Sequence, residues 1–103
     1  MTHIRRRADR HFIGRPPVQH IHARDWLHAG SRVRVDCDHQ CNVLVMDDHN
    51  YSLYRRGQRF RHFGGFFKRL PAILGVPSSG HWNTVIDLGG GSANISYAIN
   101  YLK

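Results

Sequence analysis

Short runs in which apolar and polar residues alternate constrain this chain more than any other feature of its sequence. Residues 31–37, SRVRVDC, carry apolar side chains at every second position and charged side chains between them. A period of two residues is typical of a strand that is buried on one face. The clearest case is residues 93–102, where four side chains share one face: Ile95, Tyr97, Ile99 and Tyr101.

Further runs of strand length are separated by turn residues. They occupy residues 18–23, 41–47, 70–76 and 81–88. The chain has no glutamate and few of the residues that favour exposed helices. Because turn signals recur at intervals of about 8–12 residues, the sequence predicts an all-β fold. We expect a compact antiparallel sandwich or barrel of six to eight short strands.

Three local predictions accompany this fold class. The turn DHQ between residues 31–37 and 41–47 predicts that these two strands form a β-hairpin. Residues 24–31 predict a loop anchored by Trp26 and Leu27. Residues 48–58 predict one helical turn, with Asp48 as its cap and Gly57 as its stop.

The distribution of charge divides the chain in two. Residues 1–17 carry five arginines against one aspartate and end in two prolines, so we expect a basic arm followed by a single β-sandwich domain at residues 18–103. The formal net charge of the chain is +8. This excess predicts attraction to a polyanion such as nucleic acid, or to an acidic protein partner. The alternative is a basic surface that only keeps the protein soluble.

The sequence predicts a cytoplasmic protein. The basic start is not followed by the apolar stretch of about 7–15 residues found in signal peptides. No segment approaches the roughly 18 apolar residues of a membrane span. The two cysteines, Cys37 and Cys41, imply no disulfide framework; we expect them to be reduced in the cytoplasm, or able to pair when oxidised.

The segment VPSSGHWNTVIDLGGGS contains residue types used in catalysis and phosphate binding, but in the wrong arrangement. In an extended strand His81 and Asp87 share a face, yet lie roughly 20 Å apart, far beyond the roughly 2.6–3.2 Å of a catalytic hydrogen bond. The serines lack a nucleophile elbow, and the glycines lack the lysine and helix of a phosphate loop. We therefore expect a turn, a strand and a second turn, no catalytic residue, no cofactor and no enzyme.

Nine histidines raise the question of a metal site. His20 and His22 share one face of a predicted strand, about 6.6 Å apart along it. The spacing of Cys37, His39 and Cys41 matches no zinc pattern. No metal site is predicted; His20 and His22 are the candidates for the alternative, a metal-assisted enzyme.

The most suggestive surface is the basic-aromatic segment at residues 51–69. Aromatic side chains beside arginines are typical of single-stranded nucleic-acid binding, whereas in a small sandwich the same aromatics can fill the core. The candidate polyanion-binding residues lie in the arm and in this segment. They are Arg5, Arg6, Arg7, Arg55, Arg56, Arg59, Arg61, Lys68 and Arg69. The aromatics interleaved with them are Tyr51, Tyr54, Phe60, Phe63, Phe66 and Phe67.

The blocks NVLVMDDHNYSLYRRGQRFRHFGG and VPSSGHWNTVIDLGG resemble a family of small bacterial domains, domain of unknown function 1883, over about residues 18–102. The resemblance implies a compact β-sandwich but brings no activity, ligand or catalytic residue. Some relatives are fused to TIR signalling domains, which suits a sensing or interaction module. The matching positions are Asp47, Asn50, Tyr54, Gly57, Gly64, Gly65, Pro77, Ser79, Gly80, His81, Trp82, Asp87, Leu88, Gly89 and Gly90.

These observations favour a non-enzymatic recognition module that binds a protein or a small ligand through its loops. The candidate ligand-binding residues are His81, Asn50, Tyr54 and Asp87. Binding of nucleic acid or another polyanion through the arm and residues 51–69 is the alternative. The sequence indicates neither the identity of a partner nor an oligomeric state.

Overall fold

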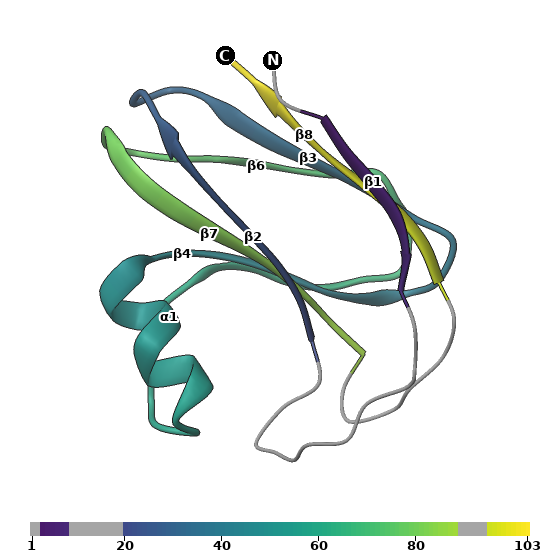
Figure 1. The fold of residues 1–103 in the computed structure, drawn as a ribbon, viewed down its shortest axis with the longest axis horizontal. Coiled ribbons are helices and arrows are strands. Elements are labelled where there is room, and N and C mark those ends of the chain that lie inside the picture. Colours follow the sequence, from purple (N-terminus) through teal and green to yellow (C-terminus); the bar gives the residue numbers. More distant parts are fainter. Residues whose placement is uncertain (1–2, 9–19, 89–94) are drawn as a thin grey trace.

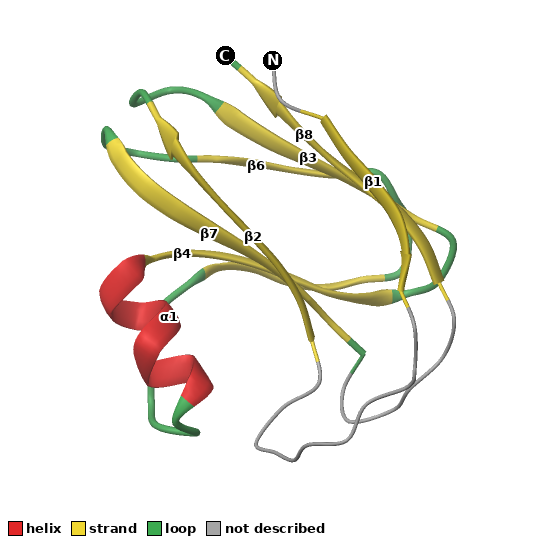
Figure 2. Ribbon diagram, in the orientation of Figure 1, coloured by secondary structure: helices red, strands yellow, loops and turns green. Residues whose placement is uncertain are grey.

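Two antiparallel four-stranded sheets pack face to face in the computed structural model, which describes the backbone of residues 3–8 and all of residues 20–88 and 95–103 (Figure 1). The first sheet has the order β1 (His3–Ala8), β8 (Ile95–Leu102), β3 (Arg32–Cys37) and β6 (Ala72–Gly75). The second has the order β2 (His20–Leu27), β7 (Gly80–Asp87), β4 (Cys41–Asp47) and β5 (Phe63–Phe67). Helix α1 (Asp48–Arg55) lies against the outer side of the second sheet (Figure 2). The predicted all-β antiparallel sandwich is confirmed.

The main core lies between the two sheets. Ile95, Tyr97, Ile99 and Tyr101 of β8 are all buried there, as their alternation predicts. The segment at residues 81–88 is confirmed as a strand whose Trp82 and Ile86 face the core. A second, smaller core lies beneath α1 and is formed by Leu44, Met46, Tyr54 and Val85.

The predicted hairpin between residues 31–37 and 41–47 is wrong. Strand β3 pairs with β6 and β8 in the first sheet, and β4 pairs with β5 and β7 in the second. The chain therefore crosses from one sheet to the other between Cys37 and Cys41. A polar turn indicates only that the chain reverses its direction. The two strands that flank it can pair edge to edge in one sheet, or they can lie in two sheets and bury their apolar faces against each other across the core.

Strand β2 is longer than predicted. The structure continues it through residues 24–27, which were expected to form a loop, and pairs Leu27 with Gly80 of β7. The apolar alternation of this strand is interrupted at Asp25, which lies between the buried Ala23 and Leu27 on the inner face. A single aspartate therefore breaks the sequence pattern of this strand, although its pairing with β7 is continuous.

Two other elements differ in detail from the sequence interpretation. The cap of α1 is Asp47 rather than Asp48, while Gly57 follows the helix with a φ of 72°, as a stop residue should. In the segment assigned to the basic arm, His3–Ala8 forms β1 and pairs with β8 at the edge of the first sheet. Residues 9–17 of the arm lie outside the described residues.

The connection between β6 and β7 is the turn that Pro77 to Gly80 predict. The Ser79 hydroxyl accepts a hydrogen bond from the backbone N–H of Ala29 at 2.9 Å. The indole N–H of Trp82 donates to the Ser78 carbonyl, also at 2.9 Å. The serines therefore hold the turn. The second predicted turn, at Gly89 to Gly91, lies outside the described residues.

No helix in the described part of the chain has the length and apolar character that a bilayer crossing requires.

Candidate functional site

A concave site lies where β4 ends and α1 begins. Asp47, the last residue of β4, caps the helix by accepting the Asn50 backbone N–H at 2.9 Å. The same carboxylate oxygen accepts the Asn50 side-chain amide, again at 2.9 Å. The Oδ1 atom of the Asn50 side chain in turn accepts the backbone N–H of Arg61 at 2.8 Å. Asn50 thus ties the start of the helix to the loop that leads into β5.

This arrangement encloses an open pocket of about 640 Å³, here called the α1–β5 pocket. Its walls include three aromatic rings, of which Phe63 and Trp82 lie with ring centroids 6.1 Å apart and Phe60 lies 5.2 Å from the His62 ring. The buried side chains of Val45 and Met46 complete the apolar part. The lining residues are Val45, Met46, Asp47, Asn50, Phe60, Arg61, His62, Phe63 and Trp82.

The charged groups of the pocket are arranged unequally. Asp47 is held by its contacts with Asn50. The Arg61 side chain is exposed and forms no ion pair with any residue that the structure describes. His62 places its Nδ1 atom 3.2 Å from the Phe63 carbonyl oxygen. Arg61 is therefore a lining residue of the pocket whose positive charge has no ion-pair partner among the described residues.

A polar network beneath α1 fixes the helix on the second sheet. Nε2 of His20 is hydrogen-bonded to the Tyr51 hydroxyl at 2.9 Å, and Nε2 of His22 to Oδ1 of Asn83 at 2.7 Å. The His22 and Tyr51 rings stack with centroids 4.0 Å apart. These side chains contact each other across the helix–sheet boundary and are not gathered around an empty space.

Two titratable groups of this boundary have strongly shifted pKa values. Tyr54 donates to Oδ2 of Asp87 at 2.5 Å, and burial, followed by this contact, raises the pKa of Tyr54 far above its usual range. Asp48 accepts two hydrogen bonds from Arg24 and one from Asn83. These contacts, with that of Arg24 the largest, hold the pKa of Asp48 well below its usual range. Both groups keep one protonation state across neutral pH.

The four candidate ligand-binding residues do not converge. Asn50 lines the α1–β5 pocket. Tyr54 and Asp87 are bonded to each other under the helix. His81 is exposed near the opposite end of β7, where it is paired in register with Trp26. The structure thus brings only Asn50 to the pocket.

The histidines considered for a metal, His20 and His22, are neighbours on the outer face of β2, with ring centroids 6.4 Å apart. Their Nε2 atoms lie against Tyr51 and Asn83. Across the residues that the structure describes, no three His, Cys, Asp or Glu side chains form a group that could hold a metal ion.

The basic-aromatic segment divides between core and surface. Tyr54 is buried, and Tyr51, Phe60 and Phe67 are half-buried. Phe63 and Phe66 of the edge strand β5 remain 44% and 56% exposed, so the aromatic side chains of this segment are divided between the interior and the surface. The side chains of Arg5, Arg6 and Arg7 lie outside the described residues. The described cations of the segment are all exposed: Arg55, Arg56, Arg59, Arg61, Lys68 and Arg69.

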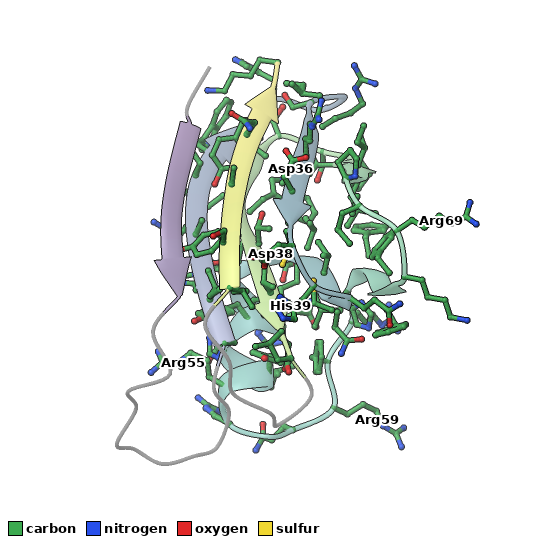
Figure 3. All side chains as sticks on the ribbon, turned by 90° about the vertical axis from the view of Figure 1, so that its right-hand side faces the viewer. Asp36, Asp38, His39, Arg55, Arg59 and Arg69 are labelled. Atoms are coloured by element: carbon green, nitrogen blue, oxygen red, sulfur yellow. The ribbon has the colours of Figure 1, made fainter. Side chains whose placement is uncertain are left out.

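These cations do not form one patch. Figure 3 shows Arg59 and Arg69 extending from one side of the molecule and Arg55 from the other. The guanidinium of Arg55 lies 5.9 Å from the Tyr51 ring centroid, in a cation–π contact.

Sequence reasoning missed the pocket itself. The sequence pattern places Asp47, Met46 and Trp82 in strands, but their common location depends on the pairing of β4 with β7. The spacing of Asp47 and Asn50, three residues apart, is typical of a helix N-terminus and was the available signal.

The residues that the structure describes form a small two-sheet β-sandwich with helix α1 packed on its second sheet. A family model described as Domain of unknown function (DUF1883) matches residues 18–102, so this chain belongs to that family. No curated protein and no solved structure matches the chain.

Proposed function

We propose that this chain is a non-enzymatic recognition module whose α1–β5 pocket binds a small acidic ligand that carries a flat ring. The observation that carries the proposal is that Arg61, which forms no ion pair with a described residue, lines the same pocket as Phe60, Phe63 and Trp82. The pocket volume of about 640 Å³ lies within the usual range for small-molecule sites.

The polar groups support an anion rather than a cation as the ligand. Arg61 presents a planar set of N–H donors that suits a carboxylate or phosphate. Its backbone is held by Asn50, which limits the entropy lost when the side chain is ordered by a ligand. The flat ring of the ligand would lie against Phe63 and Trp82, as aromatic pairs prefer.

The same contacts support binding without catalysis. Asp47 is occupied as the helix cap and the His62 ring nitrogen Nδ1 lies against the Phe63 carbonyl. His81 and Asp87, the pair that first suggested chemistry, occupy opposite ends of β7, roughly 20 Å apart by strand rise.

Ligand-observed NMR against a fragment library tests the proposal. Half of the fragments should carry a carboxylate or phosphate on an aromatic ring, and the other half should be their neutral amides. We expect the acids to be enriched among the fragments that bind. Arg61→Gln should weaken their binding about tenfold or more, the cost of losing charge-assisted hydrogen bonds. Phe63→Ala should weaken it about two- to tenfold.

Arg69→Gln is the matched control, because Arg69 is an exposed arginine outside the pocket. It should leave fragment affinity unchanged. Equal binding of acids and neutral amides, or an equal loss in the Arg61 and Arg69 variants, would contradict the proposal.

Single-stranded nucleic acid is a second candidate ligand, and one specific observation favours it. Phe63 and Phe66 are exposed on an edge strand close to cations that lack ion-pair partners among the described residues. Base stacking on such rings is tolerant of sequence. The spread of the cations over two sides of the molecule makes this candidate weaker than the pocket.

Fluorescence anisotropy with labelled oligo(dT) separates the two candidates. Nucleic-acid binding predicts an affinity that falls steeply with salt and drops about fivefold or more in Phe66→Ala, which leaves the pocket lining intact. No measurable binding at low salt would remove this candidate and leave the pocket proposal standing.

A further inference from the structure

The crossing between the two sheets carries a pair of cysteines that the α1–β5 pocket does not use. Cys37 is the last residue of β3 and is paired in register with Tyr97; Cys41 is the first residue of β4 and is paired with Phe67. Both thiols are free. Cys41 belongs to the main apolar cluster, and Cys37 packs against the same cluster. The structure therefore places two thiols together at the join of the sheets.

The segment between the cysteines is held in place. The backbone N–H of Asp38 donates to the Ser96 carbonyl at 3.2 Å, and the Ser96 N–H donates to the Asp38 carboxylate at 3.1 Å. The His39 ring pairs with the same carboxylate at 2.9 Å. Figure 3 shows Asp38 and His39 on the side of the molecule that faces the viewer. The thiols thus lie on an anchored connection.

The two thiols differ in access. Cys41 is 1% exposed and packs in the main core, whereas Cys37 is only half-buried, beside the exposed residues Asp38 and His39. An oxidant in solution can reach Cys37 first. Cys41, on the core side of Cys37, is then the thiol available to react with the oxidised Cys37.

The electrostatics of the pair agree with this order. The hydrogen bond from Cys41, helped by the backbone N–H of His39, lowers the pKa of Cys37 to about 6. The Cys37 contact and burial raise the pKa of Cys41. Near neutral pH the negative charge resides on Cys37, and a thiolate is the form that attacks.

We propose that Cys37 and Cys41 form a hydroperoxide-reactive dithiol, in which Cys37 is oxidised first and Cys41 resolves the product as a disulfide. In the first step the Cys37 thiolate attacks one oxygen of hydrogen peroxide, the O–O bond breaks, and Cys37 becomes a sulfenic acid as the departing hydroxide takes up a proton to form water. In the second step the Cys41 sulfur attacks the Cys37 sulfur. The S–O bond breaks, and the departing hydroxide takes the Cys41 proton and leaves as water.

The balance closes with one peroxide as the oxidant. Two thiols and one hydrogen peroxide yield one disulfide and two waters. A dithiol reductant reverses the reaction by thiol–disulfide exchange. The product joins the end of a strand in one sheet to the start of a strand in the other.

The test uses the whole chain, treated with a small excess of hydrogen peroxide and analysed by intact mass and peptide mapping. We expect the loss of two hydrogen atoms, mapped to a Cys37–Cys41 link and restored by a dithiol reductant. The rate of thiol loss should rise with pH with a midpoint near the Cys37 pKa of about 6. An ordinary thiol titrates near pH 8.5.

Two variants separate the roles of the cysteines, and circular dichroism confirms that each is folded. Cys41→Ala, which keeps the buried position apolar, should trap a Cys37 sulfenic acid that a dimedone-type reagent labels. It should also move the midpoint of the rate to higher pH because the hydrogen bond is lost. Cys37→Ala should slow thiol oxidation more than about tenfold, because the remaining thiol is buried and protonated.

Oxidation of Cys37→Ala at the rate of the unchanged chain would overturn the proposal. So would the absence of an intramolecular disulfide in the unchanged chain, or the absence of a dimedone adduct in Cys41→Ala. Peptide mapping excludes oxygen added to methionine, which would otherwise give the same mass gain as a sulfenic acid.

Discussion

At the scale of single residues, two buried tyrosines of this protein have opposite hydrogen-bonding states. The hydroxyl of Tyr54 donates to Asp87, whereas the hydroxyl of Tyr101 is buried with no hydrogen-bond partner among the described residues. Burial, followed by the field of Asp25, raises the pKa of Tyr101 to about 12. One hydroxyl therefore stabilises the fold and the other imposes a desolvation cost.

This difference predicts opposite results for the same chemical change. Tyr54→Phe should lower the free energy of unfolding by about 1–3 kcal/mol, because the Asp87 carboxylate loses a charge-assisted hydrogen bond in a half-buried position. Tyr101→Phe should leave it unchanged within about 0.5 kcal/mol or raise it, because an unpaired buried hydroxyl is removed. Urea unfolding followed by circular dichroism measures both. Equal losses in the two variants would contradict this assignment.

At the scale of the elements, β5 depends on one of its two adjacent glycines. Gly64 has a φ of 91°, and a Cβ atom placed there would lie 2.1 Å from the Val43 carbonyl oxygen. Gly65 has nothing within 4 Å of the corresponding position. Of these two positions, only residue 64 must be a glycine for the backbone to adopt this conformation.

Gly64→Ala should therefore destabilise the protein by more than about 2 kcal/mol or prevent folding, since steric overlap with the backbone adds to a strained φ. Gly65→Ala is the matched control and should change the free energy of unfolding by less than about 1 kcal/mol. Thermal unfolding of the two variants provides the comparison. A Gly64 variant as stable as the Gly65 variant would show that the β5 backbone is not as described.

The positions of strands could be predicted from the sequence where every second side chain is buried. The pairing of the strands could not be predicted. β8 shows its buried face as a clean alternation because every second side chain enters one core. β2 does not, because Asp25 occupies an inner position between apolar residues. Which sheet a strand joins depends on partners far along the chain, so the turn between β3 and β4 was misread as a hairpin.

The pocket was hidden for the same reason. Its walls come from β4, α1, β5 with the loop that precedes it, and β7. No periodicity within one segment indicates that these elements will meet. Four residues of the family pattern are predicted from the sequence to bind a ligand: His81, Asn50, Tyr54 and Asp87. In the structure several residues of that pattern make contacts within the fold: Asp47 caps α1, Asn50 joins α1 to the next loop, and Ser79 holds a turn.

At the scale of the whole molecule, the strands at the two ends of the described chain, β1 and β8, contribute unequally to the stability of the fold. β1 is an edge strand whose one neighbour in the sheet is β8, whereas β8 lies between β1 and β3. β8 also supplies buried side chains to the main core.

A chain that begins at residue 18 should therefore stay folded, while one that ends at residue 94 should not. Removal of an edge strand exposes one row of backbone groups. Removal of the central strand β8 leaves β1 without a partner and β3 paired with β6 alone, and it opens the core. The dispersion of amide signals in two-dimensional NMR spectra measures the difference. An unfolded 18–103 chain would show that residues 1–17 are part of the domain and not an arm.

The order of the strands also fixes when this protein can fold during its synthesis. β1 is made first, but its hydrogen-bonding partner β8 spans Ile95–Leu102, close to the other end of the sequence. β3 likewise lacks its central neighbour until that strand emerges from the ribosome. The first sheet therefore cannot be completed until β8 is available, and contacts between segments so far apart in the sequence are the slow ones to form.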